Sequence, residues 1–360
     1  MTFPADPSGR RAQVVGTGLI GASIGLALRA RGWHVTGRDR DPAHADRAAS
    51  LGAVDALGTD AAADITFVAT PVSTVAAEAT AALAASPGGL VTDVGSVKAP
   101  IVAAVGSARF VGGHPMAGSE QDGVEGADPE LFEGATWVLT PTASTDPEAF
   151  ARVRAAVTSL GADVVAVSPE RHDTLVAVVS HVPHLAAATL MGIAAEGAEE
   201  HAAMLRLAAG GFRDMTRIAA GHPGIWPDIC AENRAAIVAA LDRLLVALGD
   251  MRDVVSAGDR AGLLHLLDAA RTARINLPGR VAQAESLVEV RVPVPDRPGA
   301  LAEVTTRASA LGVNIVDLEV AHSLEGDRGV IVLVADAVGG ERLRADLAGR
   351  GYRPAVQSLV

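Results

Sequence analysis

Short apolar segments alternate with helical patterns along the first part of the chain. Between Gln13 and about Ser168 several of the apolar segments lack polar alternation. Strands of that kind are typical of a sheet that is buried on both faces. We therefore expect an α/β domain with a mostly parallel sheet and helices on both sides. The candidate strands are A-Q-V-V-G, W-H-V-T-G-R-D, D-I-T-F-V-A-T, G-L-V-T-D-V, R-F-V-G-G, T-W-V-L-T and A-D-V-V-A-V.

The strand patterns stop after Ser168, and Ala-rich and Leu-rich helices follow as far as about Leu277. Ser168, Pro169 and Glu170 form a predicted helix start, with an N-cap, a first-turn proline and a favourable first-turn charge. This part of the chain is expected to be all-α. Residues 278–286 are interpreted as a linker.

A third pattern begins at Leu287 and predicts β-α-β-β-α-β. The stretch V-E-V-R-V-P-V alternates as a strand does, and P-G-A-L-A-E-V-T-T-R-A-S-A-L-G has proline at its start and glycine past its end, as a helix does. The expected domains are therefore 10–168, 169–283 and 287–360.

The segment from Leu175 to Ala195 contains no Asp, Glu, Lys or Arg. By hydropathy it fits a membrane span, a buried core helix or the wall of a site. It carries Ser180, His181 and His184 and is interrupted by Pro183, so it is weak evidence for a membrane.

Composition limits the classes of function. The formal charge is −12 and the pI about 5.3, so no global basic surface predicts nucleic-acid binding. Cys230 is the only cysteine, so no internal disulfide or cysteine metal cluster is expected, and we assign no metal. The N-terminal stretch M-T-F-P-A-D-P-S-G-R-R lacks the apolar run of a signal peptide, which makes the cytoplasm the expected location.

A glycine-rich loop follows the first strand and opens a helix. Its pattern matches a dinucleotide-binding turn: one glycine permits the tight turn, the second lets the backbone approach a pyrophosphate, and the third lets helix meet strand. Asp39 at the end of the second strand suits an adenosine ribose and favours NAD, whereas the flanking Arg38 and Arg40 keep NADP as an alternative. The expected cofactor loop is Gly16, Thr17, Gly18, Leu19, Ile20 and Gly21.

Two further motifs carry candidate chemistry. His114 and Ser96 each lie at the carboxyl end of a later strand, where a doubly wound sheet forms its ligand crevice. A plain turn at His114 is the alternative. Asp214 and Arg217 are three residues apart on a predicted helix and can pair, although such surface pairs are common.

Taken together, the motifs resemble the prephenate dehydrogenase family from about Gln13 to Leu277. The tail resembles an ACT domain, a small amino-acid-sensing module, through D-R-P-G-A-L-A-E-V and L-G-V-N-I-V-D-L-E-V. The family motifs, in the family's order, are G-T-G-L-I-G, T-D-V-G-S-V-K, F-V-G-G-H-P-M-A-G-S-E, S-P-E-R-H-D, V-V-S-H-V-P-H, G-G-F-R-D-M-T-R-I-A and W-P-D-I-C-A-E-N.

The resemblance implies a Rossmann-type NAD-binding domain, a helical dimerisation domain and a likeness to enzymes of tyrosine biosynthesis. The implied reaction is the NAD-dependent oxidative decarboxylation of prephenate to 4-hydroxyphenylpyruvate by a cytoplasmic homodimer. His114 matches the family's catalytic base, and Ser96 matches the serine that orients it and the nicotinamide. An imidazole suits this role because its pKa of about 6.5 lies near working pH.

The resemblance also implies a substrate pocket. Arg217 matches the arginine that binds a substrate carboxylate, and Glu120 and Asp214 match an ionic network that holds it. His184 and Trp226 are expected near the pyruvyl side chain. On a regular helix Ser180, His181 and His184 share a face, which makes this apolar segment a site wall in a buried helical core. His172 and His181 fit either the pocket or a structural role, and Lys98 has no assigned role.

Other readings remain open. Arogenate, alone or together with prephenate, is the rival substrate. A phosphoglycerate-type dehydrogenase and a non-catalytic amino-acid-binding regulator are more distant alternatives. For the tail we expect tyrosine or phenylalanine as an effector, while added dimer interface is the alternative. The expected effector residues are Asp296, Pro298, Gly299, Asn314 and Ile315.

Overall fold

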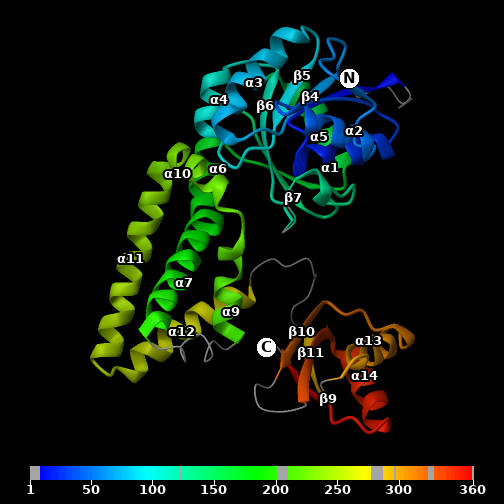
Figure 1. Cartoon of the computed structure of the whole chain (residues 1–360). Helices are drawn as coiled ribbons and strands as arrows, with labels where there is room; N and C mark the ends of the chain where they lie inside the picture. Colours follow the sequence, from blue (N-terminus) through cyan, green and yellow to red (C-terminus); the bar gives the residue numbers. More distant parts are fainter. Residues whose placement is uncertain are drawn as a thin grey trace. The chain divides into compact units, whose positions relative to one another are not determined.

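The computed structural model describes residues 9–119, 121, 123–200, 210–276, 287–295, 297–322 and 328–358. The chain forms two compact units, Met1–Ala247 and Leu248–Val360. Figure 1 labels the helices and strands in chain order. The units are defined by compactness alone, so the domain limits predicted from sequence texture stay predictions.

The first unit contains an eight-stranded sheet with the order β3-β2-β1-β4-β5-β6-β7-β8. Neighbouring strands are parallel except for β6 and β7, which confirms the mostly parallel sheet. Seven strands correspond to the predicted segments, and the short β3 was not predicted. The strands are β1 Arg11–Val15, β2 His34–Arg38, β3 Ala56–Leu57, β4 Ile65–Val68, β5 Leu90–Asp93, β6 Phe110–Pro115, β7 Thr136–Thr140 and β8 Asp163–Ala166.

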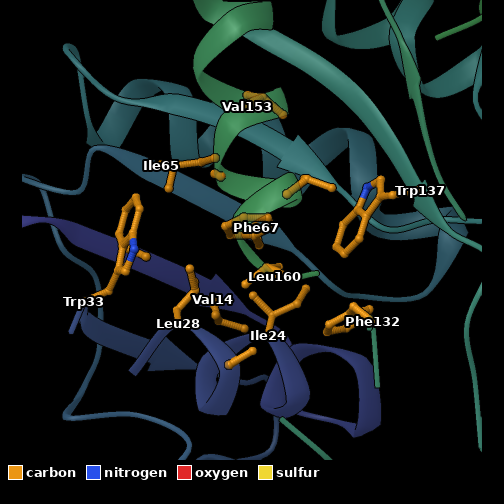
Figure 2. Close-up of a cluster of buried hydrophobic side chains, with 14 of the residues drawn as sticks. Val14, Ile24, Leu28, Trp33, Ile65, Phe67, Phe132, Trp137, Val153 and Leu160 are labelled. Atoms are coloured by element: carbon orange, nitrogen blue, oxygen red, sulfur yellow. The ribbon is translucent and has the colours of Figure 1, made fainter. Parts of the chain in front are cut away.

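Helices cover both faces of this sheet. On one face Ile24 and Leu28 of α1 pack with Val153 of α5 around Phe67 (Figure 2). On the other face α3 and α4 pack against alternate strand residues such as Val68. The buried strands lack polar alternation because both of their faces meet apolar helices. The helices are α1 Leu19–Ala30, α2 Pro42–Ser50, α3 Val72–Ala85, α4 Ala99–Val105 and α5 Pro147–Ser159.

The strand order reverses between β1 and β4, which lie side by side at the centre of the sheet. In an open α/β sheet the crevice beyond the carboxyl ends of such strands is where ligands bind. The glycine loop leaves β1 there, and Asp39 follows β2 directly. Ser96 lies shortly after β5, and His114 is the penultimate residue of β6.

Helices replace strands after β8, as predicted. The Ser168 hydroxyl accepts a hydrogen bond from the Arg171 N–H at 3.2 Å, and Pro169 occupies the first turn. The helices of this part of the chain are α6 Pro169–Val176, α7 Val182–Glu200, α9 Gly210–Thr216, α10 Trp226–Glu232, α11 Arg234–Ser256 and α12 Arg260–Ile275.

The S-H-V-P-H segment corrects two expectations. A π-helical turn over Ala177–His181 interrupts the regular helix, and the Val182 N–H bonds to the Ala177 carbonyl, five residues back. The residue alignment expected from a continuous α-helix therefore does not apply across this turn. The segment is also not wholly buried within this chain, because Val179 is 66% exposed and Ile193 is 62% exposed.

The second unit contains a four-stranded antiparallel sheet with the order β10-β11-β9-β12. The element order β-α-β-β-α-β agrees with the prediction. Val290, Leu333 and Leu343 lie in its buried core. The elements are β9 Leu287–Pro295, α13 Ala300–Ala310, β10 Asp317–His322, β11 Arg328–Asp336, α14 Ala337–Gly349 and β12 Ala355–Ser358.

Candidate active site

The glycine loop has the backbone geometry that its sequence predicts. Gly16 has φ +90°, and a Cβ there would lie 2.4 Å from the carbonyl oxygen of Ala69. A Cβ on Gly21 would lie 1.8 Å from the carbonyl oxygen of Gly16, so any side chain would separate α1 from β1. A Cβ on Gly18, by contrast, would meet nothing within 4 Å. Gly18 caps α1 without a side-chain hydrogen bond, which leaves the helix N-terminus open toward a phosphate.

Asp39 lies beside this loop. Its Oδ2 accepts a hydrogen bond from the Thr17 N–H at 2.7 Å, and its Oδ1 accepts one from the Asp41 N–H at 3.0 Å. The guanidinium of Arg38 forms an ion pair with Glu78 on α3. Arg38 is therefore committed to a carboxylate.

A chain of three side chains ends at His114. The Nδ1 of His114 lies 2.8 Å from Nε2 of His172, and Nδ1 of His172 lies 2.7 Å from Oδ1 of Asp173. The Asp173 carboxylate also accepts the backbone N–H groups of Lys98 at 2.7 Å and Ala99 at 2.8 Å. These contacts join β6 and the start of α4 to helix α6.

The hydrogen bonds of this chain assign the tautomers. An ionised carboxylate only accepts, so Nδ1 of His172 donates to Asp173. In the tautomer in which Nε2 of His172 is the acceptor, Nδ1 of His114 donates to it. The lone pair of His114 therefore resides on Nε2. The arrangement leaves a proton acceptor on the side of the ring that faces away from His172.

Electrostatics favour the neutral form of that acceptor. Burial lowers the pKa of His114 well below 6.5, and the nearby His172, Lys98 and His181 lower it further. A histidine with so low a pKa is unprotonated at neutral pH and is ready to take up a proton.

A second cluster is formed by residues of the π-helical turn, of α7 and of α10. The ring of His184 stacks on Trp226 with centroids 3.7 Å apart and an interplanar angle of 16°. His181 meets the same indole edge-on at 6.1 Å. The Asn233 amide donates to Nδ1 of His181 at 3.3 Å and to the Asp173 carbonyl at 2.9 Å. His181 Nε2 therefore carries the proton, and it is a buried donor without a partner among the described residues.

The structure brings some of the remaining predicted residues near this cluster. Arg217 begins a 3₁₀ turn, Arg217–Ala220, which packs against α7. A Cβ on Gly221, the residue after this turn, would lie 3.9 Å from His184 Cε1. Asp214 and Arg217 are both exposed, and helix α9 ends before Arg217, so the two are not on one continuous α-helix. Glu120 lies outside the described residues.

Ser96 was predicted to orient His114, whereas the side chain that contacts His114 is His172. Ser96 and Ser180 are half-buried, and their hydroxyl groups form no hydrogen bond among the residues that the structure describes. His172 and Asp173 contact the ring of His114 directly or through one neighbour. Both belong to the S-P-E-R-H-D motif, so the adjacent His-Asp pair was the sequence signal for a second group behind the base. The roles predicted for Ser96 and Ser180 stay predictions.

The second unit has an open cavity of about 1290 Å³. Pro298 and Gly299 of the predicted effector set line it, whereas Asn314 and Ile315 do not. Asp296 lies outside the described residues. The basic side chains at this cavity are Arg297, Arg307, Arg350 and Arg353.

A Rossmann-type sheet with an open helix N-terminus and a histidine at its carboxyl edge is typical of dehydrogenases with a nucleotide-binding domain. The family model described as "Prephenate dehydrogenase, nucleotide-binding domain" matches residues 24–166, and the one described as "Prephenate dehydrogenase, dimerization domain" matches residues 168–269. The chain belongs to the prephenate dehydrogenase family.

Individual relatives agree with this assignment. Prephenate dehydrogenase of Bacillus subtilis is 34% identical over 334 residues, which are 88% of this chain and 90% of that protein. The crystal structure of A. aeolicus prephenate dehydrogenase in complex with hydroxyphenyl propionate and NAD+ has a TM-score of 0.70 and 32% identity over 75% of this chain and 99% of that one. Synechocystis arogenate dehydrogenase has a TM-score of 0.65 and 33% identity over 73% of this chain and 98% of that one.

Proposed function

We propose that this chain catalyses the NAD-dependent oxidative decarboxylation of prephenate to 4-hydroxyphenylpyruvate. Family membership supports the reaction class. The observation that carries the residue assignment is the Asp173–His172–His114 chain, because it leaves an unprotonated Nε2 beside the ligand crevice. Family membership and these side-chain contacts both argue against a purely regulatory protein.

The residues around the glycine loop fit NAD. Gly18 leaves open space before α1, and Asp39 is the group suited to an adenosine ribose. NAD bound there supplies the hydride acceptor of the reaction. Arg40 is exposed and keeps NADP as the competing cofactor, while the pairing of Arg38 with Glu78 supports NAD.

In the proposed mechanism His114 Nε2 takes the proton of the ring hydroxyl as hydride leaves the same carbon. His172 holds the Nδ1 proton in place, and Asp173 stabilises His172 in the required tautomer. Loss of the ring carboxylate as CO₂ then yields the aromatic product. Positioned proton transfer of this kind contributes ~10²–10⁴-fold to the rate.

Arg217 is the proposed ligand of a substrate carboxylate, because a planar guanidinium pairs with a carboxylate through two parallel hydrogen bonds. Arg217→Ala is expected to raise KM for prephenate about tenfold or more and to leave NAD affinity unchanged. Arg213→Ala, on the same segment, is the matched control. An unchanged KM in Arg217→Ala would make the arginine structural.

The substrate is tested by steady-state absorbance at the NADH band with prephenate and arogenate, each with NAD and NADP. We expect the largest kcat/KM for prephenate with NAD. A preference for arogenate would identify the amino group, instead of the keto group, as the recognised feature. No turnover with either substrate would refute the proposed function.

The helix Pro169–Glu196 is, among the described residues, long and apolar enough by length and composition to cross a membrane. Its polar side chains are used in folded contacts: Asp173 binds the start of α4, and His181 binds Asn233. These contacts support a packing element in a cytoplasmic enzyme, and the matching dimerisation domain supports a homodimer.

For the second unit we propose an ACT-like regulatory domain that binds tyrosine or phenylalanine. Its basic cavity suits the carboxylate of an amino acid, and Arg353 there has no ion-pair partner among the described residues. In the full chain, Arg353→Gln should weaken inhibition by tyrosine, whereas Arg344→Gln, outside the cavity, should not. Inhibition that is competitive with prephenate and unchanged by Arg353→Gln would place the effect at the active site instead.

A further inference from the structure

Lys98 is the only lysine among the 30 lysines and arginines of the chain. It is fully buried, although charged side chains rarely are. Every other residue counted among the lysines and arginines is an arginine, and Lys98 is the exception. A buried site that keeps a lysine in such a chain has a specific requirement for a compact cationic head group.

The side chain of Lys98 binds the residue that precedes His114. Its Nζ donates to the Gly113 carbonyl at 2.8 Å and contacts the carboxylate of Asp93, which is also fully buried. Oδ1 of Asp93 accepts the Gly113 N–H at 3.0 Å. Both polar groups of Gly113 are therefore held by this one pair of side chains.

Asp93 and Lys98 bind Gly113 just beyond the point where the backbone pairing of β5 with β6 ends. The parallel pairing of β5 with β6 covers Val91 with Phe110 and Thr92 with Val111, and it stops there. Gly113 lies beyond it, and its N–H and C=O bind the side chains of Asp93 and Lys98. A Cβ on Gly113 would lie 2.6 Å from the Asp93 carbonyl oxygen, so the close approach requires glycine.

Lys98 also reaches the other end of the histidine chain. Its own backbone N–H donates to Asp173 at 2.7 Å. The contacts therefore close a ring: Lys98 binds Asp173, Asp173 binds His172, His172 binds His114, and the peptide before His114 returns to Lys98. We propose that Lys98, together with Asp93, is a positioning residue that fixes the His114 ring against His172 by clamping the Gly113 peptide.

The side chain of Lys98 runs beside two glycines, and its head group is the compact cation that the contacts require. A Cβ on Gly112 would lie 3.4 Å from Lys98 Cδ, and a Cβ on Gly95 would lie 3.5 Å from Nζ. Two glycines thus flank the side chain, and a guanidinium is larger than the ammonium that fits between Asp93 and the Gly113 carbonyl. Lys98→Arg keeps the charge and loses the geometry.

The proposal rests on the proposed function, and three variants test it in the full chain. We expect Lys98→Met to lower kcat about 10- to 100-fold with the Kd for NAD unchanged, since a shift of about 1 Å at a reacting group costs up to 10²-fold. Lys98→Arg should lower kcat similarly. The double variant Asp93→Asn/Lys98→Met removes both buried charges, so it keeps the fold testable if Lys98→Met is unstable.

The pH profile separates positioning from a merely structural role. The titratable or charged groups around His114 are His172, Lys98 and His181, with Asp173 and Asp93 behind them. Because the Lys98 charge lowers the pKa of His114, its removal in Lys98→Met should move the acid limb of kcat/KM to higher pH. Lys98→Arg should leave that limb in place.

Arg109→Met is the matched control. Arg109 directly precedes β6, at the end of the strand opposite to His114, and it donates to the backbone carbonyls of Leu83, Ser86 and Gly89. It should lower Tm and keep kcat within about twofold. A double variant that is folded and keeps more than half of the kcat would overturn the proposal. If the wild-type chain fails to turn over prephenate, the proposed function fails, while NMR titration of the His114 ring in the same variants still tests the clamp.

Discussion

The ring of His114 contacts His172, which is held in turn by Asp173, and these contacts form only in the folded chain. Nδ1 is committed to His172, so Nε2 is the nitrogen available to a substrate hydroxyl. His114→Asn removes the basic Nε2 and keeps a smaller polar side chain. We expect kcat to fall by about two orders of magnitude or more, because general-base catalysis contributes ~10²–10⁴-fold.

The measurement is steady-state kinetics together with NAD binding. The Kd for NAD and the KM for prephenate should stay near the wild-type values, because the imidazole acts on the reacting proton. A His114→Asn variant that keeps most of its turnover would remove His114 from the mechanism.

His181 makes stability depend on pH. Burial lowers its pKa from 6.5 to about 4 in the folded chain. Between pH 6.5 and 4 the unfolded chain therefore binds a proton that the folded chain does not. Stability is lost as the pH falls through this window, by up to about 3 kcal/mol from this group.

Urea unfolding at pH 7, 5.5 and 4.5 measures this effect. His181→Gln should flatten the fall in the free energy of unfolding, whereas His34→Gln, at a half-exposed side chain, should leave it unchanged. Equal slopes in the two variants would show that His181 is not the titrating group.

The residues of the site differ in how far the sequence could predict them. His114 and Trp226 belong to motifs that indicate their chemistry. The structure places Trp226 against His184. The contact of His114 with His172 was not foreseen, because the two are far apart in sequence and a histidine in a helix fits a structural role equally well. Lys98 had no assigned role because its burial is a property of the fold.

At the scale of elements, helix α6 is joined to the start of α4 by one carboxylate. Three donors converge on Asp173: the backbone N–H groups of Lys98 and Ala99, and the ring of His172. An asparagine offers only one acceptor oxygen and adds an NH₂ group, so it cannot serve all three donors. We expect Asp173→Asn to lower kcat at least about 10²-fold by releasing the tautomer of His172.

Glu170→Gln is the control, since Glu170 lies exposed on the same helix. The pH dependence of kcat/KM should change in Asp173→Asn and not in Glu170→Gln. Normal turnover in Asp173→Asn would show that His172 keeps its orientation without the carboxylate.

The elements themselves were largely predictable, and the exceptions have local causes. The apolar strands were recognised because burial on both faces removes polar residues from the pattern. Strand β3 contains only the exposed residues Ala56–Leu57, so it is too short to form a recognisable strand pattern. The π turn before Val182 was not foreseen, although Pro183 indicates a disturbed helix because it lacks an N–H for the carbonyl four residues back.

At the scale of the molecule, apolar side chains remain exposed on the long helices. Leu245 on α11 is 65% exposed, and Ile193 on α7 is 62% exposed. Within the homodimer proposed here, such residues belong to the subunit interface. Leu245→Glu is therefore expected to shift the dimer toward monomer.

Light scattering after size-exclusion chromatography at several concentrations measures this shift. Arg243→Glu places the same acidic side chain on the opposite side of α11 and should leave the mass unchanged. A Leu245→Glu variant with an unchanged mass would exclude this face of α11 from the interface.

His172 of α6, which is bound by Asp173 of the same helix, holds the ring of His114 at the carboxyl edge of the eight-stranded sheet. If α6 were separated from the sheet, the Nδ1 proton of His114 would lose its acceptor at His172, and the ring could adopt either neutral tautomer. Proton removal by His114 at the proposed site therefore depends on α6 staying packed beside β6 and the start of α4.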